Sequence, residues 1–146
     1  MLIEIKIDED CAEPKVLIIT NRITDEINEF VRKVSEQDVS VLAGFKDDSV
    51  FVLDPDNILR IYAADQKVYA ISEDGEYRLR LRLYEVEERL RSQKFVRISN
   101  SEIINLKKVR DFDLGFSGTI CVRFQNKTQS YVSRRYVPKI KQVLGL

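Results

Sequence analysis

The sequence predicts a mainly antiparallel β fold with a few short helices, preceded by a small α+β appendage at the N-terminus. Short runs rich in β-branched and aromatic residues are separated by turn formers, a pattern typical of all-β domains. The hydrophobic content of 44% over 146 residues is enough for a real core. This length fits one compact domain, or a domain of about 100 residues with an appendage.

The first part of the chain predicts two strands, a helix and a third strand. Isoleucines alternate with polar residues over 3–7, and residues 16–19 form a continuous apolar run, so both segments are expected to be strands. Over residues 23–34 the apolar positions recur at helical spacing, with Thr24 suited to the cap. The third strand is expected to end near Phe45.

The rest of the chain contains closely spaced turn signals between strand-like runs. One such run, 77–83, alternates strictly between leucines and arginines, which predicts a strand with one buried and one basic face. The basic face could simply be exposed to solvent, or its arginines could contact phosphates. The turn signals lie at 54–57, 65–67, 73–75 and 125–127.

Two short helices interrupt this strand pattern. Apolar residues at helical spacing predict one helix within 83–93 and another near 140–144. Pro138 lacks an amide hydrogen and therefore belongs in a first turn, so residues 133–137 are expected to form the bend into the last helix. That bend carries two arginines.

Charge is divided unevenly along the chain, although the net charge is zero. Residues 1–56 contain 6 Lys and Arg against 14 Asp and Glu, whereas residues 57–146 contain 18 against 10. A segregated basic part suggests a polyanionic partner, and the alternative is a solvated surface with uneven charge. We expect an acidic appendage over 1–43, with an interaction or dimerisation role, and a basic domain over 44–146.

Composition argues against catalysis, metal binding and a bound cofactor. The chain has no histidine, the commonest general base and metal ligand, and no glycine-rich phosphate loop. Cys11 and Cys121 show no metal-ligand spacing, so free thiols are expected. No apolar run is long enough to span a bilayer and the N-terminus lacks the pattern of a signal peptide, so a cytoplasmic location is expected.

Several linked motifs resemble the LytTR family of bacterial DNA-binding domains. They are FVRISNSEIINLKKV at 95–109, YVSRRYVPKIKQVL at 131–144 and ILRIYAADQKVYAISEDGEYRLRLRLYEVEERL at 58–90. The resemblance covers roughly residues 44–146. It implies a set of small antiparallel β-sheets and a stand-alone transcription regulator that inserts inter-strand loops into successive major grooves of duplex DNA.

The resemblance also implies the DNA-contacting residues. Asn100 matches a loop residue that contacts DNA, and Arg135 matches the base-contacting residue of the bend before the last helix. Ser99 stands where the family often has histidine, which leaves the base preferred there open. The candidate set consists of three loops and a basic pair: Gln66, Lys67, Ser99, Asn100, Ser101, Lys107, Lys108, Arg134 and Arg135. An Asn amide suits adenine, the Arg fork suits guanine, and Lys107 and Lys108 are expected to contact the backbone at most.

Other interpretations of these residues remain open at this stage. Ser and Asn are common turn formers, so residues 99–101 could form a plain connection. A protein-interaction module acting through the acidic appendage and an RNA-binding protein are the alternative functions. The expected partners are duplex DNA and a second copy on a repeated site, and the resemblance adds a small membrane protein that restrains activity. No small-molecule substrate is implied.

Overall fold

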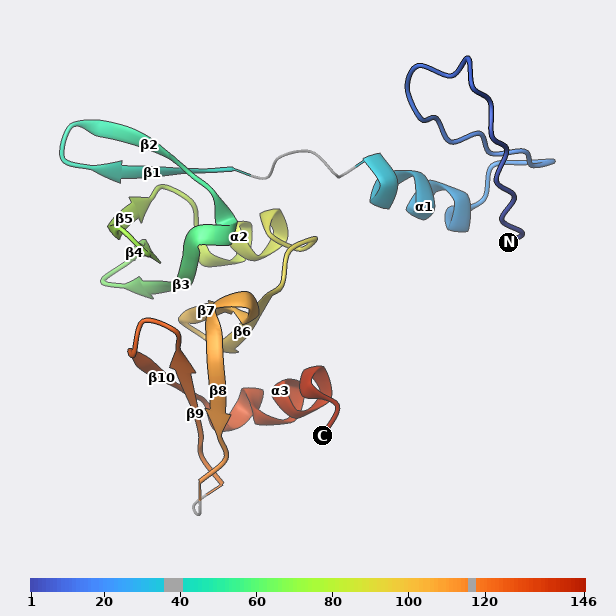
Figure 1. Cartoon of the computed structure of the whole chain (residues 1–146). Coiled ribbons are helices and arrows are strands. Elements are labelled where there is room, and N and C mark those ends of the chain that lie inside the picture. The colour runs from blue at the N-terminus through green and yellow to red at the C-terminus, as the bar shows by residue number, and fades with distance from the viewer. Residues whose placement is uncertain (36–40, 116–117) are drawn as a thin grey trace. The chain divides into compact units, whose positions relative to one another are not determined.

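The computed structural model describes residues 1–35, 41–115 and 118–146 (Figure 1). The chain divides into two units, Met1–Gln37 and Asp38–Leu146. The first strand of the larger unit, β1 (Leu42–Lys46), runs across the boundary predicted at residues 43 and 44. The strand predicted to close the appendage therefore belongs to the larger unit.

The smaller unit contains the predicted helix, α1 (Asp25–Ser35). The hydroxyl of Thr24 accepts a hydrogen bond from the amide of Ile27 at 3.3 Å, which caps the first turn as expected. The strands predicted at 3–7 and 16–19 are wrong, because both segments lack regular secondary structure. Neither has a hydrogen-bonded partner strand within the described chain, and a strand is stable only when it is paired.

A seven-stranded antiparallel sheet forms most of the larger unit, in the order β2-β1-β5-β4-β3-β7-β6. Its members after β1 are β2 (Ser49–Leu53), β3 (Ile58–Ala64), β4 (Lys67–Ser72), β5 (Gly75–Leu79), β6 (Phe95–Ser99) and β7 (Glu102–Asn105). The predicted mainly antiparallel β fold with short helices is confirmed. The predicted turn signals in this region lie where one strand gives way to the next, and the first of them contains the 3-10 turn η1 (Pro55–Asn57).

A second, three-stranded antiparallel sheet follows in the order β10-β9-β8. Its strands are β8 (Val109–Asp113), β9 (Ile120–Phe124) and β10 (Gln129–Val132), and the 3-10 turns η2 (Leu106–Lys108) and η3 (Arg134–Tyr136) flank it. The chain ends in α3 (Val137–Leu144), which has Pro138 in its first turn as predicted.

The helix predicted within 83–93 is α2 (Leu83–Arg89). The prediction of one continuous strand over 77–83 is wrong, because β5 ends at Leu79. Leu83 and Val86 are buried on α2 in the same core as Leu79, and the chain has to turn for the helix to cover the sheet. The alternating leucines therefore extend past the end of the strand and into the first turn of α2.

Two hydrophobic cores lie on opposite faces of β7. Ile103 packs in the core between the large sheet and α2, together with Ile61, Leu79 and Val86. Ile104, the next residue, packs in a second core with Val122 and Phe124 of β9 and Ile140 of α3. Because successive strand residues face opposite ways, β7 anchors both cores. The turn between β6 and β7 is thereby held from both sides.

Within the described ranges, no helix is long and apolar enough to cross a membrane. The same residues contain no group of three His, Cys, Asp or Glu side chains placed to hold a metal ion. Cys11 and Cys121 are free thiols.

Candidate DNA-binding surface

Two of the predicted reading loops lie at the same end of the large sheet. Asp65 and Gln66 connect β3 to β4, and Asn100 and Ser101 connect β6 to β7. β3 and β7 are antiparallel neighbours with Tyr62 opposite Glu102, so the end of β3 lies beside the start of β7. The amide of Ala63 donates to the carbonyl of Ser101 at 2.8 Å, which joins the two turns directly.

The third predicted loop, η3, lies against the turn between β6 and β7. The amide of Ser133 donates to the carbonyl of Ile98 at 2.9 Å. The hydroxyl of Tyr136 donates to Oδ1 of Asn100 at 3.2 Å. Arg134 and Arg135, both exposed, are therefore held next to Asn100 although they lie more than thirty residues away in sequence.

Arg97 supports the 99–101 loop from its inner side. Its Nε donates to the carbonyl of Ser99 at 2.9 Å and its Nη2 to the carbonyl of Asn100 at 2.5 Å. Its Nη1 pairs with Glu87 of α2 at 3.2 Å, and the Arg97 side chain is only 16% exposed. These contacts give Arg97 a structural role in the loop.

The serines of the loop differ in exposure. The amide of Ser101 donates to Oγ of Ser99 at 3.2 Å, and the two hydroxyls lie 3.3 Å apart. Ser99 is half-buried and stabilises the turn, which agrees with the plain-turn interpretation for this residue. Asn100 and Ser101 are exposed, so their side chains are accessible to a ligand.

The β3–β4 turn has an uncommon backbone for its residues. Asp65 and Gln66 have φ angles of 52° and 64°, the left-handed conformation at both central positions that defines a type I′ hairpin turn. Asparagine and glycine are preferred at these positions, and a glutamine side chain is strained there. Gln66 and the following Lys67 are both exposed.

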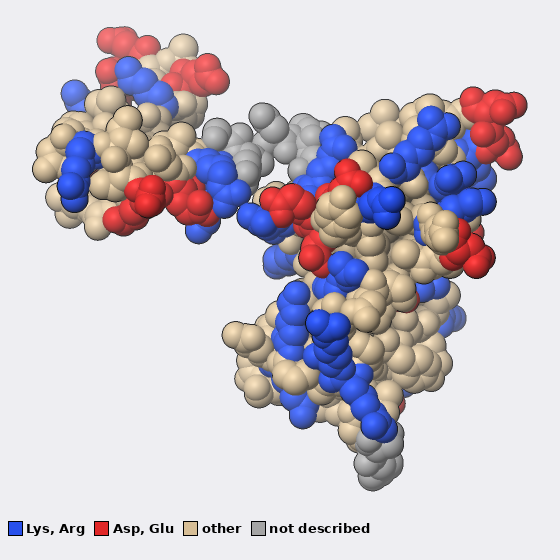
Figure 2. Space-filling view, turned by 180° about the vertical axis from the view of Figure 1, so that it is seen from behind, with Lys and Arg blue, Asp and Glu red and all other residues tan. Residues whose placement is uncertain are grey.

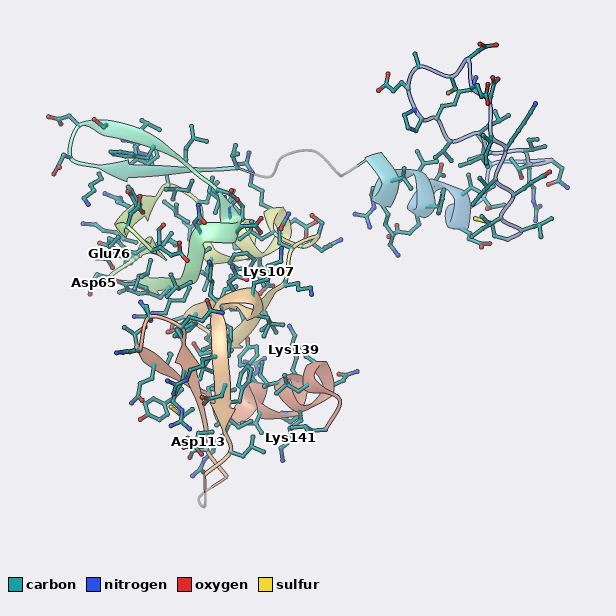
Figure 3. The ribbon with its side chains drawn as sticks, in the orientation of Figure 1. Asp65, Glu76, Lys107, Asp113, Lys139 and Lys141 are labelled. Atoms are coloured by element: carbon teal, nitrogen blue, oxygen red, sulfur yellow. The ribbon has the colours of Figure 1, made fainter. Side chains whose placement is uncertain are left out.

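Lys107 and Lys108 lie away from the three loops. They belong to η2, at the opposite end of β7 from Asn100 and Ser101, and Figure 3 shows Lys107 well separated from Asp65. Lys107 pairs with Asp56 at 3.1 Å and Lys108 with Glu73 at 2.5 Å. The structure thus brings together seven of the nine predicted site residues and separates this pair from them.

Comparisons with known proteins show the family of the chain. The model of the LytTr DNA-binding domain family matches residues 48–145 of the chain. The chain belongs to the LytTR family. It is 29% identical to an uncharacterized HTH-type transcriptional regulator of Staphylococcus aureus strain NCTC 8325, and the alignment covers 100% of this chain and 99% of that protein. A relative from strain MSSA476 is 29% identical over 92% of both chains.

A solved structure shows the same fold. It is a LytTr DNA-binding domain from Bacillus cereus, with a TM-score of 0.69 and 22% sequence identity, and the match covers 73% of this chain and 97% of that one. In the described part of the present LytTR chain, strands separate the three helices from one another, so no two of them form a helix-turn-helix.

Several side-chain contacts hold β3, the strand that leads into the predicted loop at 65–67 of this LytTR domain. The hydroxyl of Tyr62 hydrogen-bonds the carboxylate of Glu76, and this bond, with some burial, raises the pKa of Tyr62 to about 12. The Tyr62 ring stacks on Tyr69 of β4 at 5.4 Å between centroids. Arg60 lies over the same ring and pairs with Glu102 of β7 at 3.0 Å. These contacts tie β3 to both of its neighbours.

The basic character predicted for the LytTR domain appears on its surface. On the face shown in Figure 2, Lys and Arg prevail over Asp and Glu around β8–β10 and α3, in the lower part of the view. From Arg123 to Leu146 there are six basic residues and no acidic one. Lys139 and Lys141 extend from α3 (Figure 3). A surface of this kind attracts a polyanion over a distance of about one Debye length.

Proposed function

We propose that the protein is a transcription regulator that binds duplex DNA in a sequence-specific manner through its inter-strand loops. The observation that carries the proposal is the convergence of three loops from separate parts of the chain at one end of the large sheet. Their exposed side chains offer an amide, guanidinium groups and an ammonium group, which are the groups that read base edges and phosphates.

Each loop has a distinct role in the proposal. Asn100 reads a base edge through its amide, and adenine N6 and N7 match that group. Arg135 reads guanine O6 and N7 through its fork of donors, while Arg134 and Lys67 contact phosphates. Gln66, at the tip of the hairpin, is the third base-reading residue. We leave Lys107 and Lys108 outside the reading surface, because they lie at the opposite end of β7 from the three loops, where they pair with Asp56 and Glu73.

We further propose that two copies bind a repeated site and that the acidic first unit serves protein interaction. The described aliphatic side chains of this unit lie outside both hydrophobic cores, and Ile3, Ile5 and Ile7 are more than 80% exposed. A second copy, or a small membrane protein that restrains activity, would cover such a surface. The cytoplasm, where bacterial DNA lies, is the proposed location. We assign no catalytic role.

Selection from a duplex library with random inserts tests the proposal. The full-length protein should enrich one motif, and Asn100→Ala and Arg135→Ala should each lose about 1–3 kcal/mol on it and relax one base-pair position. Arg91→Ala is the matched control, since Arg91 lies just after α2, is exposed and pairs with Glu88, three positions earlier. Enrichment of no motif by the folded wild-type protein would refute the proposal.

A further inference from the structure

A side-chain hydrogen bond from the hydroxyl of Tyr136 joins the two loops proposed to read bases, 99–101 and 134–136. The hydroxyl donates to Oδ1 of Asn100 at 3.2 Å, across 36 positions of sequence. Nδ2 of the same amide has no hydrogen-bond partner among the residues that the structure describes. The contact thus distinguishes the two ends of the Asn100 amide.

The ring of Tyr136 is anchored, which makes its hydroxyl a fixed reference point. The ring is half-buried and packs against the second core, which contains Ile98, Val132 and Ile140. The amide of Tyr136 also donates to the carbonyl of Ser133 at 2.9 Å, within the η3 turn. The hydroxyl of Tyr136 therefore has a defined position beside the 99–101 loop.

From these contacts we infer that Tyr136 is a positioning residue that sets which way the Asn100 amide faces the DNA. The inference rests on the proposed function. With Oδ1 turned toward Tyr136, the two Nδ2 protons face outward and donate to an acceptor such as N7 of a purine. The second lone pair of Oδ1 stays available to accept from the N6 amino group of adenine.

The orientation has a consequence for selectivity. An amide free to rotate by 180° offers either a donor or an acceptor at the same place, and therefore distinguishes bases poorly. A tyrosine hydroxyl can also accept from an amide nitrogen, but in the structure the hydroxyl of Tyr136 donates to Oδ1, which leaves Nδ2 free for DNA. This orientation is in place before DNA arrives, so that binding does not have to order the side chain. The hydrogen bond also couples the two loops, since a shift of η3 that carries Arg135 moves the hydroxyl that holds Asn100.

Tyr136→Phe removes the hydroxyl and keeps the ring, so it isolates this contact. In the random duplex library we expect the motif to relax at the one base-pair position that Asn100→Ala also relaxes, by about 3- to 10-fold, the usual worth of one hydrogen bond. The position relaxed by Arg135→Ala should keep its preference. Tyr84→Phe, which alters an exposed tyrosine of α2, is the matched control and should leave the motif unchanged.

Combining variants separates positioning from direct contact. In the Asn100→Ala background, Tyr136→Phe should have no further effect on affinity, because the group that it positions is gone. An equal loss in both backgrounds, or a uniform weakening at all sequences, would mean that Tyr136 contacts DNA itself and would overturn the inference. A lowered melting temperature with an unaltered motif would assign the hydroxyl to stability and would also overturn it.

The wild-type result separates this inference from the proposed function. If the wild-type protein enriches a motif and Tyr136→Phe enriches the same motif with the same preferences, only the positioning role fails. If the wild-type protein enriches none, the proposed function fails and the role of Tyr136 falls with it.

Discussion

Gln66 occupies a backbone conformation that glycine adopts more readily. Its φ angle of 64° lies in the left-handed region, which costs a residue with a Cβ atom about 1–2 kcal/mol. Strained residues persist where the surrounding structure enforces them, and they cluster at functional sites. A glutamine at the tip of an exposed hairpin is therefore consistent with a side chain needed for binding.

Gln66→Gly should stabilise the fold and weaken recognition. Relief of strain, less the entropy that glycine adds to the unfolded chain, should raise the free energy of unfolding by about 0.5–1 kcal/mol. Loss of the side chain should lower discrimination between the selected motif and a scrambled duplex. Urea unfolding and fluorescence anisotropy on the same sample measure both effects. A more stable variant with unchanged discrimination would remove Gln66 from the reading surface.

Arg97→Lys should loosen the reading loop from within. A lysine has one ammonium group and cannot reproduce the fork that donates to Ser99, Asn100 and Glu87. We expect a loss of about 1–3 kcal/mol in the free energy of unfolding, typical of hydrogen bonds made by a charged group. Arg91→Lys, in an exposed pair on α2, should stay within about 0.5 kcal/mol. Equal stabilities for the two variants would argue against the support role.

Between elements, the second sheet is held by a cross-strand ion pair. Asp111 of β8 lies opposite Arg123 of β9, and Arg123 Nε donates to its carboxylate at 2.7 Å. This hydrogen bond, followed by one from Arg110, lowers the pKa of Asp111 below its ordinary value. The pair joins the strands that back the second core.

The Asp111 pair should weaken in acid. Because its pKa is lowered in the folded state, the carboxylate stabilises the fold above its unfolded value of about 3.9, and this contribution is lost as pH falls through the lower, folded value. The melting temperature of Asp111→Asn should therefore fall below that of wild type at neutral pH, and the two should converge in acid. Asp48→Asn, in the exposed β1–β2 turn, is the control. A difference that does not change with pH would exclude the charge as its cause.

Some elements could be predicted from the sequence because their signals are local. Pro138 marked the first turn of α3, and the cap at Thr24 with the apolar spacing that follows marked α1. The segment 3–7 had an equally clear strand pattern and is not a strand, because a strand also requires a partner that the described chain does not supply. Alternation of apolar and polar residues indicates that successive side chains face two different environments. It does not show that a partner strand is present.

The sequence suggested the residues of the proposed reading surface one by one, but not that they lie together. The motifs indicated Asn100 and Arg135 through their resemblance to a family, whereas their proximity depends on the order of strands and on contacts across the second core. Tyr136 was not among the predicted site residues, because its hydroxyl makes a bond to a residue far away in sequence. The ion pairs of Lys107 and Lys108 with Asp56 and Glu73 were equally invisible in the sequence.

For the whole molecule, the division into two units suggests separate tasks. All the proposed base-reading residues lie in the unit Asp38–Leu146, and the unit Met1–Gln37 contributes none. Both cores are also formed by residues from Leu42 onward. Folding of the larger unit should therefore not require the smaller one.

A truncated chain of residues 41–146 should fold and keep its sequence selectivity. The cut lies before Leu42, which is 1% exposed and would be lost if the chain began at residue 44. Circular dichroism should show the β fold, and library selection should return the full-length motif. If each copy neutralises about five phosphates, the slope of log K against log salt should be near −4 to −5 per copy in both chains.

The truncation should abolish self-association if the first unit provides the contact between copies. We expect the full-length chain to bind a repeated site with cooperativity and the truncated chain to fill the two repeats independently, as measured by anisotropy on duplexes with one or two copies of the motif. A truncated chain starting at residue 44 serves as the control for core damage, since it differs mainly by the loss of Leu42.

Cooperative binding by residues 41–146 would place the contact between copies in the larger unit. A folded truncated chain without sequence selectivity would show that the division of tasks between the two units is wrong.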